Sequence, residues 1–232
     1  GWAPEPVRVG AFADAPAVLA VGAELKSTVC LYRGGRAVLS EHVGDLKAGR
    51  VLRHFMGVID DLEALFDCPP AALAADLHPQ YLSTDYARRR AAGRLRDRPA
   101  VPLIGVQHHH AHVAGVLAEH GRSDEVIGLA LDGAGYGPDG TTWGCEVLRA
   151  WPADFERLGH LRPIPMPGGD RAAVECVRPA ASLLREAFGE GWPARPAAAR
   201  LRERGGADLE ALEAQLASGL NCPRASSLGR LF

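Results

Sequence analysis

The fold is decided by residues 17–40, which read AVLAVGAELKSTVCLYRGGRAVLS. Three short, mostly apolar stretches have the length and composition of β-strands: Ala17–Val21, Thr28–Tyr32 and Arg36–Ser40. The loop Gly22–Ser27 separates the first two, and the pair Gly34-Gly35 before the third is typical of a tight hairpin turn. This region is therefore predicted to form a strand, a loop, a strand, a turn and a strand.

Helices and further strands alternate after this region. Apolar residues recur at helical spacing over Leu46–Phe66, with Asp45 in place to cap the helix N-terminus. The other predicted helices are Leu82–Leu95, His108–His120, Asp170 to about Ala187, and Asp208–Leu216. Further strands are predicted at Ala72–Leu77, Pro102–Val106, Val126–Leu131, Thr142–Arg149 and Leu158–Leu161. Hairpins followed by alternating strands and helices favour a layered α/β fold.

Two stretches have the composition of connecting segments. Residues 1–16 are rich in Pro and Ala and are expected to form an entering linker, and residues 190–206 are expected to form a surface excursion. The chain starts at Gly1 without an initiator Met and without the basic and apolar segments of a signal peptide. It is therefore expected to be the interior of a longer polypeptide.

Composition excludes several classes of protein. The 232 residues are 47% hydrophobic and 23% charged, the range of ordinary globular proteins. A net charge of −2 does not favour a general nucleic-acid surface, and no apolar stretch reaches the ~18 residues of a membrane span. The five cysteines are widely spaced and contain no CxxC, which argues against a disulfide framework or a cysteine zinc site and favours a cytoplasmic protein.

Four histidines within Gln107–His112, QHHHAH, are the sharpest candidate site. On a helix, positions i and i+4 share one face, so His108 and His112 could bind one metal ion, while His109 and His110 point elsewhere. Position 109 lacks the Glu of a zincin motif. The alternative is a solvated histidine cluster at the start of a helix.

Three glycine-containing loops are candidate anion or metal sites. Asp132 opens the loop DGAGYGPDG after a buried strand, where a carboxylate can bind a metal ion and glycine amides can approach an anion. Gly22–Ser27 ends in Lys26 and Ser27, which could hold a phosphate. The turn 168–170 opens a predicted helix and suits a phosphate or ribose. Ordinary hairpin loops and a simple N-cap are the alternatives.

Two other groups of residues are expected to be structural. The arginines of residues 88–98 lack interleaved aromatic residues and are expected to form a solvated helix face. Cys30 and Cys145 are expected to be core thiols. No cysteine has an evident adjacent base, so the sequence does not support nucleophilic catalysis by this chain.

Eight motifs occur in the order found in the HypF family, the carbamoyltransferases of [NiFe]-hydrogenase maturation. They are Val21–Thr28, Glu41–Leu46, Ala75–Thr84, Val106–Val113, Leu131–Gly140, Trp143–Glu146, Pro165–Asp170 and Ser226–Phe232. The chain resembles the carbamoyl-transfer module of that family over nearly its whole length. The module is similar to TsaD-type tRNA threonylcarbamoyl transferases and to antibiotic O-carbamoyltransferases.

The resemblance implies an α/β fold of the actin/sugar-kinase-like (ASKHA) type, with a mixed, ribonuclease-H-like sheet flanked by helices. Residues 17–232 would be the first lobe and the start of a second, truncated lobe, and residues 1–16 would be a linker from a YrdC-like domain. The resemblance also implies an iron or zinc ion held by His108, His112 and Asp132.

The resemblance further implies catalytic roles for Lys26 and Asp132 and contacts with ATP-derived nucleotide or carbamoyl adenylate. The implied binding residues are Gly22, Lys26, Ser27, Gly133, Gly135, Gly168, Gly169 and Asp170. In the family, a YrdC-like domain makes carbamoyl adenylate from carbamoyl phosphate and ATP. The module would pass the carbamoyl group to the C-terminal Cys of HypE.

Several departures from the family pattern bear on this activity. The acylphosphatase-like, cysteine-zinc and YrdC-like regions are not in this sequence, and the family continues after Phe232 into a lobe with a further Asp ligand. Cys176-Val177 and Cys222–Arg224 also vary the pattern. The alternatives are an O-carbamoyltransferase with a small-molecule acceptor and an inactive, truncated nucleotide- or partner-binding module. A metal-dependent hydrolase lacks an identifiable general base.

Overall fold

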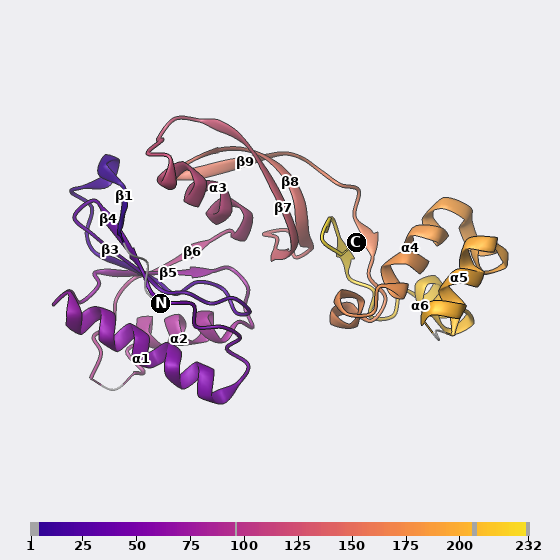
Figure 1. Cartoon of the computed structure of the whole chain (residues 1–232), viewed down its shortest axis with the longest axis horizontal. Coiled ribbons are helices and arrows are strands. Elements are labelled where there is room, and N and C mark those ends of the chain that lie inside the picture. The colour runs from indigo at the N-terminus through magenta and orange to yellow at the C-terminus, as the bar shows by residue number, and fades with distance from the viewer. Residues whose placement is uncertain (1–4, 96, 206–207, 231–232) are drawn as a thin grey trace. The chain divides into compact units, whose positions relative to one another are not determined.

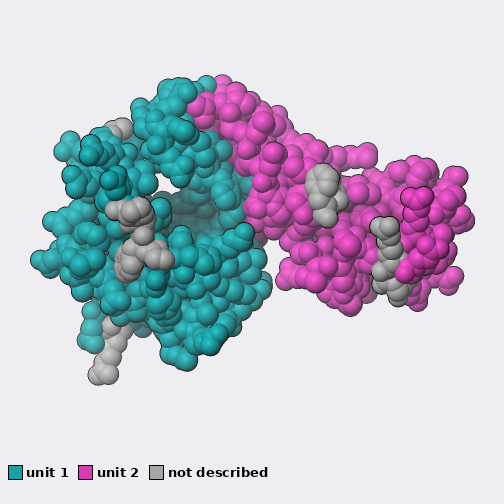
Figure 2. All heavy atoms as spheres, viewed as in Figure 1, with its two compact units in different colours: residues 1–125, 151–154 teal, residues 126–150, 155–232 magenta. Residues whose placement is uncertain are grey.

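The computed structural model describes residues 5–95, 97–205 and 208–230. The chain forms two compact units (Figure 1, Figure 2). Unit 1 consists of Gly1–Glu125 with Trp151–Asp154, and unit 2 consists of Val126–Ala150 with Phe155–Phe232. Among the helices of the described ranges, none combines the length and hydropathy that a bilayer crossing requires.

Unit 1 is built on a six-stranded mixed sheet with the strand order β1-β4-β3-β2-β5-β6. Its strands are β1 (Val7–Arg8), β2 (Val18–Ala20), β3 (Cys30–Arg33), β4 (Arg36–Leu39), β5 (Ala72–Asp76) and β6 (Leu103–Val106). The strands β2, β3 and β4 are antiparallel, whereas β5 and β6 continue the sheet parallel to β2. Gly34 and Gly35 have φ values of 53° and 73°, as a two-residue hairpin turn requires. The predicted strands of this region are confirmed.

Helices cover the sheet of unit 1. They are α1 (Gly49–Leu65), α2 (Leu82–Ala91) and α3 (His108–Glu119). α1 and α2 lie on one side of the sheet and α3 on the other (Figure 1). Phe55 of α1 meets Tyr86 of α2 edge-on, with ring centres 5.6 Å apart. Fully buried Ile59 and Leu62 extend this contact into a core with strand residues such as Leu19.

α1 begins later than the apolar pattern predicts, and the predicted N-cap is wrong. Leu46 is buried but lies ahead of the helix, where its backbone N–H donates to the Glu24 carbonyl at 3.1 Å. Asp45 accepts a hydrogen bond from the Lys47 amide at 3.0 Å and therefore caps a turn. The helix itself starts at Gly49.

The N-terminal segment carries regular structure where its composition predicts a linker. Val7–Arg8 pairs antiparallel with β4, and the short 3₁₀ helix η1 (Gly10–Phe12) follows. These residues therefore extend the sheet of unit 1 by an edge strand.

The arginine-rich region is only partly a solvated face. Arg90 is fully buried, and its guanidinium donates to both oxygens of Glu63 in α1, at 2.5 and 3.2 Å. Arg98 donates to the same carboxylate, whereas Arg88 and Arg89 are exposed. Because an unpaired buried charge is very costly, this network ties α2 to α1.

Unit 2 combines a small sheet with a helical part. Its strands are β7 (Val126–Tyr136), β8 (Thr142–Trp151), β9 (Asp154–His160), β10 (Ile164–Pro165) and β11 (Arg224–Ala225). They follow the order β10-β11-β8-β7, and β9 pairs with β8. The helices are η2 (Gly169–Ala173), α4 (Val177–Phe188), η3 (Gly189–Ala194), α5 (Pro196–Gly205) and α6 (Leu209–Ser218).

Three predictions in unit 2 are wrong. β7 continues through most of the predicted glycine-rich loop to Tyr136, with a register shift between Leu131 and Gly135. Asp170 lies in η2, and the long helix starts only at Val177. The predicted surface excursion forms η3 and α5, and Trp192 within it is fully buried.

Candidate functional site

The histidine cluster lies at the carboxyl end of a parallel strand. α3 starts directly after β6, and the Gln107 side chain caps it by accepting from the His110 amide at 2.9 Å. His108 and His112 stand one turn apart, with their Nε2 atoms separated by 3.3 Å. Two nitrogens bound to one tetrahedral ion at about 2.0–2.1 Å lie about 3.3 Å apart. The pair therefore has the spacing and donor type of two metal ligands.

The other two histidines face elsewhere, as helical spacing predicts. His109 is fully buried, and its Nδ1 lies 3.2 Å from the Gln107 side-chain nitrogen. His110 Nε2 lies 2.9 Å from the Trp151 carbonyl. These contacts hold α3 in unit 1 and leave His108 and His112 as the candidate ligands of this cluster.

Asp76 contacts His108, and the sequence reasoning missed it. Its Oδ2 lies 2.6 Å from His108 Nδ1, and its Oδ1 accepts from the His78 amide at 2.8 Å. In the sheet, Asp76 is the register partner of Val106, two residues before His108. A carboxylate ending the strand next to the one that precedes QHHHAH was the signal that could have found it.

A cavity of about 280 Å³ adjoins the pair within unit 1. Its polar lining comes from Asp76, His108 and His112, and Gly22 brings backbone to its wall. The rest of the lining is small and apolar: Ala20, Ala23, Ala74, Ala75, Val106 and Ala111. The cavity can therefore hold a compact group beside the two imidazoles.

The loop Gly22–Ser27 is only partly at this cavity. Gly22 has a φ of +67°, and a Cβ there would stand 2.5 Å from the Thr28 carbonyl oxygen, so the position requires glycine. Lys26 is exposed in a turn and Ser27 is buried. Neither of them lines the cavity.

The first turn of α2 holds this loop and Asp76 together. The Leu82 amide donates to the buried Glu24 carboxylate at 3.2 Å, and the Ser83 hydroxyl donates to the Gly22 carbonyl at 3.1 Å. The Thr84 hydroxyl donates to the Asp76 carbonyl at 3.1 Å. Glu24, which the sequence reasoning did not single out, thus satisfies one backbone N–H at the N-terminus of α2.

Asp132 lies in unit 2, and its surroundings combine several motifs. Its Oδ1 accepts from the Gly133 amide at 2.6 Å, and its carbonyl accepts from the Gly229 amide at 3.1 Å. The Gly133 carbonyl accepts from the Ser227 hydroxyl at 2.5 Å. A Cβ on Gly144 would stand 2.6 Å from the Ser227 Cα, so this packing requires glycine. The joint binding of Asp132 with the histidines stays a prediction.

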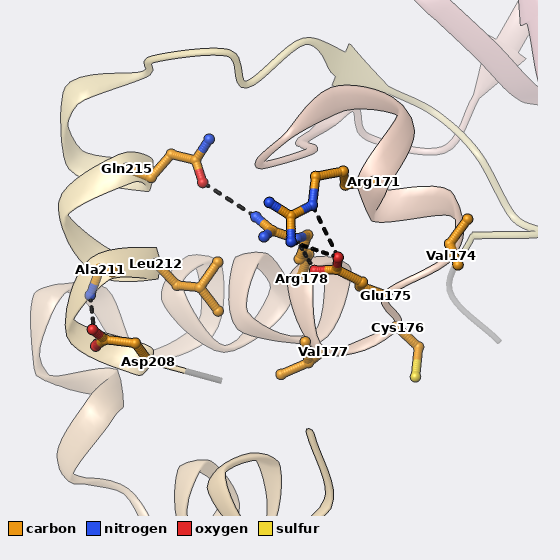
Figure 3. Close-up of a pocket in the computed structure, with 10 residues that line it drawn as sticks. All are labelled: Arg171, Val174, Glu175, Cys176, Val177, Arg178, Asp208, Ala211, Leu212 and Gln215. Atoms are coloured by element: carbon orange, nitrogen blue, oxygen red, sulfur yellow. Dashed lines mark hydrogen bonds and ion pairs between the residues drawn. The ribbon is translucent and has the colours of Figure 1, made fainter. Parts of the chain in front are cut away.

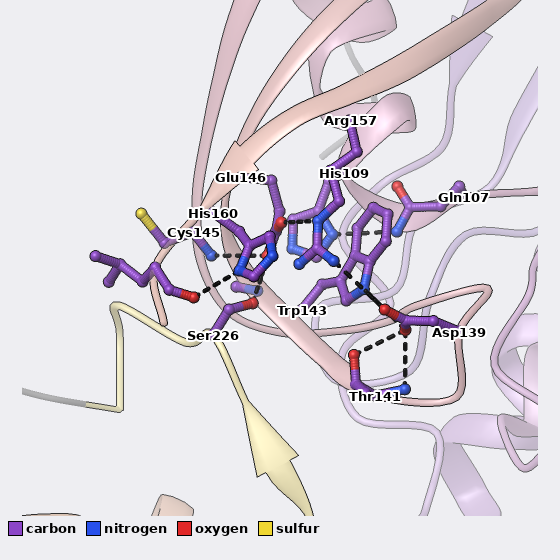
Figure 4. Close-up of polar contacts among 12 residues, drawn as sticks. Gln107, His109, Asp139, Thr141, Trp143, Cys145, Glu146, Arg157, His160 and Ser226 are labelled. Carbon is purple, nitrogen blue, oxygen red and sulfur yellow. Dashed lines mark hydrogen bonds and ion pairs between the residues drawn. The ribbon is translucent and has the colours of Figure 1, made fainter. Parts of the chain in front are cut away.

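Glu146 is the centre of a polar network in unit 2 (Figure 4). It is fully buried and accepts from the Gly144 amide at 3.0 Å, the Ser226 hydroxyl at 2.5 Å and Arg157 Nε at 2.6 Å. The Arg157 guanidinium stacks over the Trp143 ring, 3.8 Å from its centre. Burial alone would raise the pKa of Glu146, but the hydrogen bonds from Arg157, Ser226 and Gly144 lower it below its usual range.

The turn at residues 168–170 does not line the cavity beside it. Gly168 and Gly169 have φ values of +86° and +57°, and Asp170 is exposed. A cavity of about 520 Å³ in unit 2 is lined by residues from Arg171 onward (Figure 3). There Glu175 already accepts hydrogen bonds from arginines on both sides. The charged groups of Arg171, Glu175 and Arg178 in this cavity therefore already bind one another.

Two family models and several named proteins match this chain. A family model described as the HypF Kae1-like domain matches residues 13–119. A second model, described as the carbamoyltransferase Kae1-like domain, second subdomain, matches residues 128–232. "Carbamoyltransferase HypF2" of Cupriavidus necator is 43% identical over 100% of this chain and 27% of its own length. "Carbamoyltransferase HypF" of Rhizobium leguminosarum bv. viciae is 41% identical over 100% of this chain and 28% of its own.

Solved structures give the same result. Full-length HypF in the phosphate- and nucleotide-bound form matches with a TM-score of 0.83 and 34% identity, over 98% of this chain and 28% of that one. T. kodakarensis HypF matches with a TM-score of 0.82 and 35% identity, over 98% and 30%. The chain thus spans less than a third of these relatives, and the α/β, Kae1-like fold is confirmed. On this evidence, the chain belongs to the HypF family.

Proposed function

We propose that this chain is the part of a HypF-type carbamoyltransferase that passes a carbamoyl group to an acceptor in hydrogenase maturation. The donor would be carbamoyl adenylate, made from carbamoyl phosphate and ATP, and the acceptor the C-terminal Cys of a HypE-like protein. The observation that carries the proposal is the His108–His112 pair, at ligand spacing beside a small cavity, in a chain 43% identical to a named carbamoyltransferase.

The proposed metal ion is iron or zinc, held by His108, His112 and Asp132. Imidazole nitrogens and a carboxylate oxygen form a donor set that suits either ion. When bound, such an ion supplies Lewis-acid stabilisation of charge on a phosphate or carbonyl oxygen.

Backbone and charge around the cavity support the proposed nucleotide contacts. Gly22 presents backbone without a side chain, and Lys26 is exposed in the same loop, where its ammonium group can attract phosphate. Ser27, Gly133, Gly135 and the turn at 168–170 remain proposed contacts of the nucleotide or carbamoyl adenylate. Lys26 and Asp132 remain the proposed catalytic residues.

Two of the five thiols of this chain have pKa values that disfavour a nucleophilic role. Burial raises the pKa of Cys30 to about 11 and also raises the pKa of Cys222. Because the thiolate is the nucleophilic form, these two cysteines are poor candidates for accepting a carbamoyl group. A reacting thiol on a HypE-like partner fits this, and free cysteines fit the cytoplasmic location that we also propose.

A chimera tests the function directly. The chain replaces the matching region of the Cupriavidus necator HypF2 protein, and the chimera is supplied with carbamoyl phosphate, ATP and HypE. We expect mass spectrometry to find a carbamoylated C-terminal Cys on HypE, and the His108→Ala chimera to lose this product. No transfer above a no-enzyme control would refute the proposal. Transfer to a small hydroxyl compound instead of HypE would favour the O-carbamoyltransferase alternative.

A further inference from the structure

We propose that Asp76 is a positioning residue that fixes the ring orientation and tautomer of His108, so that Nε2 is the nitrogen presented to a metal ion. The role extends the metal site proposed above and depends on it. It adds to that site a residue outside the three proposed ligands.

The contact between the two side chains determines the tautomer. Asp76 Oδ2 lies 2.6 Å from His108 Nδ1. A carboxylate accepts hydrogen bonds, so Nδ1 carries the proton, and the lone pair of the neutral ring is on Nε2. Nε2 is also the atom that stands 3.3 Å from His112 Nε2. A free imidazole would divide its population between two tautomers and several rotamers, only some of which can bind.

Asp76 is itself held in place by hydrogen bonds and by strand pairing. Its side chain is 6% exposed. Oδ1 accepts from the His78 amide at 2.8 Å, and the main-chain carbonyl accepts from the Thr84 hydroxyl at 3.1 Å. Its backbone is fixed by register pairing with Val106 of β6. Because the Asp76 carboxylate is fixed, the hydrogen bond from His108 Nδ1 also fixes the orientation of the His108 ring.

Asp76 is placed as an orienting group rather than as a ligand. It contacts the Nδ1 edge of the His108 ring, and Nε2 is on the opposite edge. A carboxylate that accepts from the far nitrogen of a metal-bound histidine raises the basicity of that ligand, and losing it typically costs about 10–100-fold in metal affinity.

Metal titration of matched variants tests the role. Asp76→Asn keeps an oxygen for the His78 amide but loses the anionic acceptor of His108. Asp85→Asn is the control, because Asp85 is an exposed carboxylate in the first turn of α2 whose partner Arg89 is 3.9 Å away. Zn²⁺ and Co²⁺ are titrated against a chelator. We expect Asp76→Asn to bind about 10–100-fold more weakly and Asp85→Asn to match the unchanged chain.

Three outcomes keep this inference separate from the metal site itself. Binding by Asp76→Asn within about threefold of the unchanged chain would overturn the role of Asp76 alone. Metal retention in the His108→Ala/His112→Ala double variant would overturn the proposed site instead. If Asp76→Asn does not fold, nitrogen-detected NMR of the unchanged, metal-free chain decides: a proton on His108 Nδ1 supports the role, and a proton on Nε2 excludes it.

Discussion

Asp76 in unit 1 and Glu146 in unit 2 are both hidden from solvent, with side chains 6% and 0% exposed, yet their surroundings differ in kind. Asp76 directs one oxygen at His108, whose ring lines a cavity. Glu146 directs both oxygens at Arg157, Ser226 and the backbone of β8, none of which is a proposed ligand. If the proposed role of Asp76 holds, the two carboxylates show that a buried carboxylate is functional or structural according to what its hydrogen-bond partner can still bind.

The largest expected effect separates metal binding from stability. His112→Ala should abolish stoichiometric zinc or iron binding, while the free energy of unfolding of the metal-free chain changes by less than about 1 kcal/mol, since His112 is exposed. Metal analysis after dialysis and urea unfolding measure the two quantities. His120→Ala, at the exposed end of the same helix, is the control and should keep its metal. Full metal retention in His112→Ala would contradict the assignment.

Glu146 should show the opposite behaviour. Glu146→Ala leaves Arg157 without its buried partner, and breaking such a pair costs about 3–5 kcal/mol. Urea unfolding measures the loss, and zinc affinity of the His108–His112 pair should stay within experimental error wherever the variant is folded. The matched control is Glu156→Ala on β9, because Glu156 and its partner Arg149 are about half exposed, so at most about 1 kcal/mol is at stake. Equal losses of unfolding free energy in Glu146→Ala and Glu156→Ala would show that the buried ion pair of Glu146 matters no more than an exposed one.

A smaller effect tests how closely the motifs of unit 2 pack. Gly144→Ala places a Cβ 2.6 Å from the Ser227 Cα and 2.8 Å from the Asp132 carbonyl oxygen. Overpacking of this kind costs about 1–3 kcal/mol. Gly159→Ala on β9 is the control, since a Cβ there meets nothing within 4 Å. The unfolding temperature should fall in Gly144→Ala and stay unchanged in Gly159→Ala. An unchanged unfolding temperature in Gly144→Ala would show that the turn at Ser227 moves aside at little cost.

The smallest effect is a pH dependence. Burial by itself raises the pKa of Glu146, yet its hydrogen bonds lower it below the usual value. The carboxylate therefore contributes stability above the unfolded-state pKa of about 4.3, and this contribution is lost as pH falls toward the folded-state pKa. Glu146→Gln should lose less stability between about pH 7 and about pH 3 than the unchanged chain. Asp139, whose pKa is also lowered, titrates in both proteins and is a common background.

Local patterns predicted the fold where local contacts decide it. The Gly34-Gly35 turn and the helix at His108 follow from neighbouring residues, and both are confirmed. The pattern failed at Leu46, which is buried by a loop contact rather than by a helix face. It also failed at Trp192, which is buried in one cluster with Ala181 of α4 and Leu212 of α6. The composition of residues 190–206 does not reveal this packing against other helices.

The candidate site shows the same limit. The spacing of His108 and His112 predicts a shared helix face, because one turn of helix is a local property. Asp76 contacts His108 across 32 positions of sequence, through the pairing of two parallel strands. No spacing rule reports such a contact. The exposure of Lys26 agrees with the alternative reading of Gly22–Ser27 as an ordinary exposed loop. The hydrogen bond from the Leu82 amide to Glu24, 58 positions apart, is another contact that no local pattern reports.

The start of α2 holds two parts of the candidate site at the same time. Leu82 and Ser83 hydrogen-bond to the loop Gly22–Ser27, and Thr84 hydrogen-bonds to Asp76, the residue that contacts His108. For protein engineering, this means that the start of α2, the loop Gly22–Ser27 and Asp76 have to be transferred together. If the histidine pair were moved to another scaffold without these residues, His108 would lose the carboxylate that orients its ring. A change in the first turn of α2 would be expected to shift both the loop Gly22–Ser27 and Asp76, and with Asp76 the ring of His108.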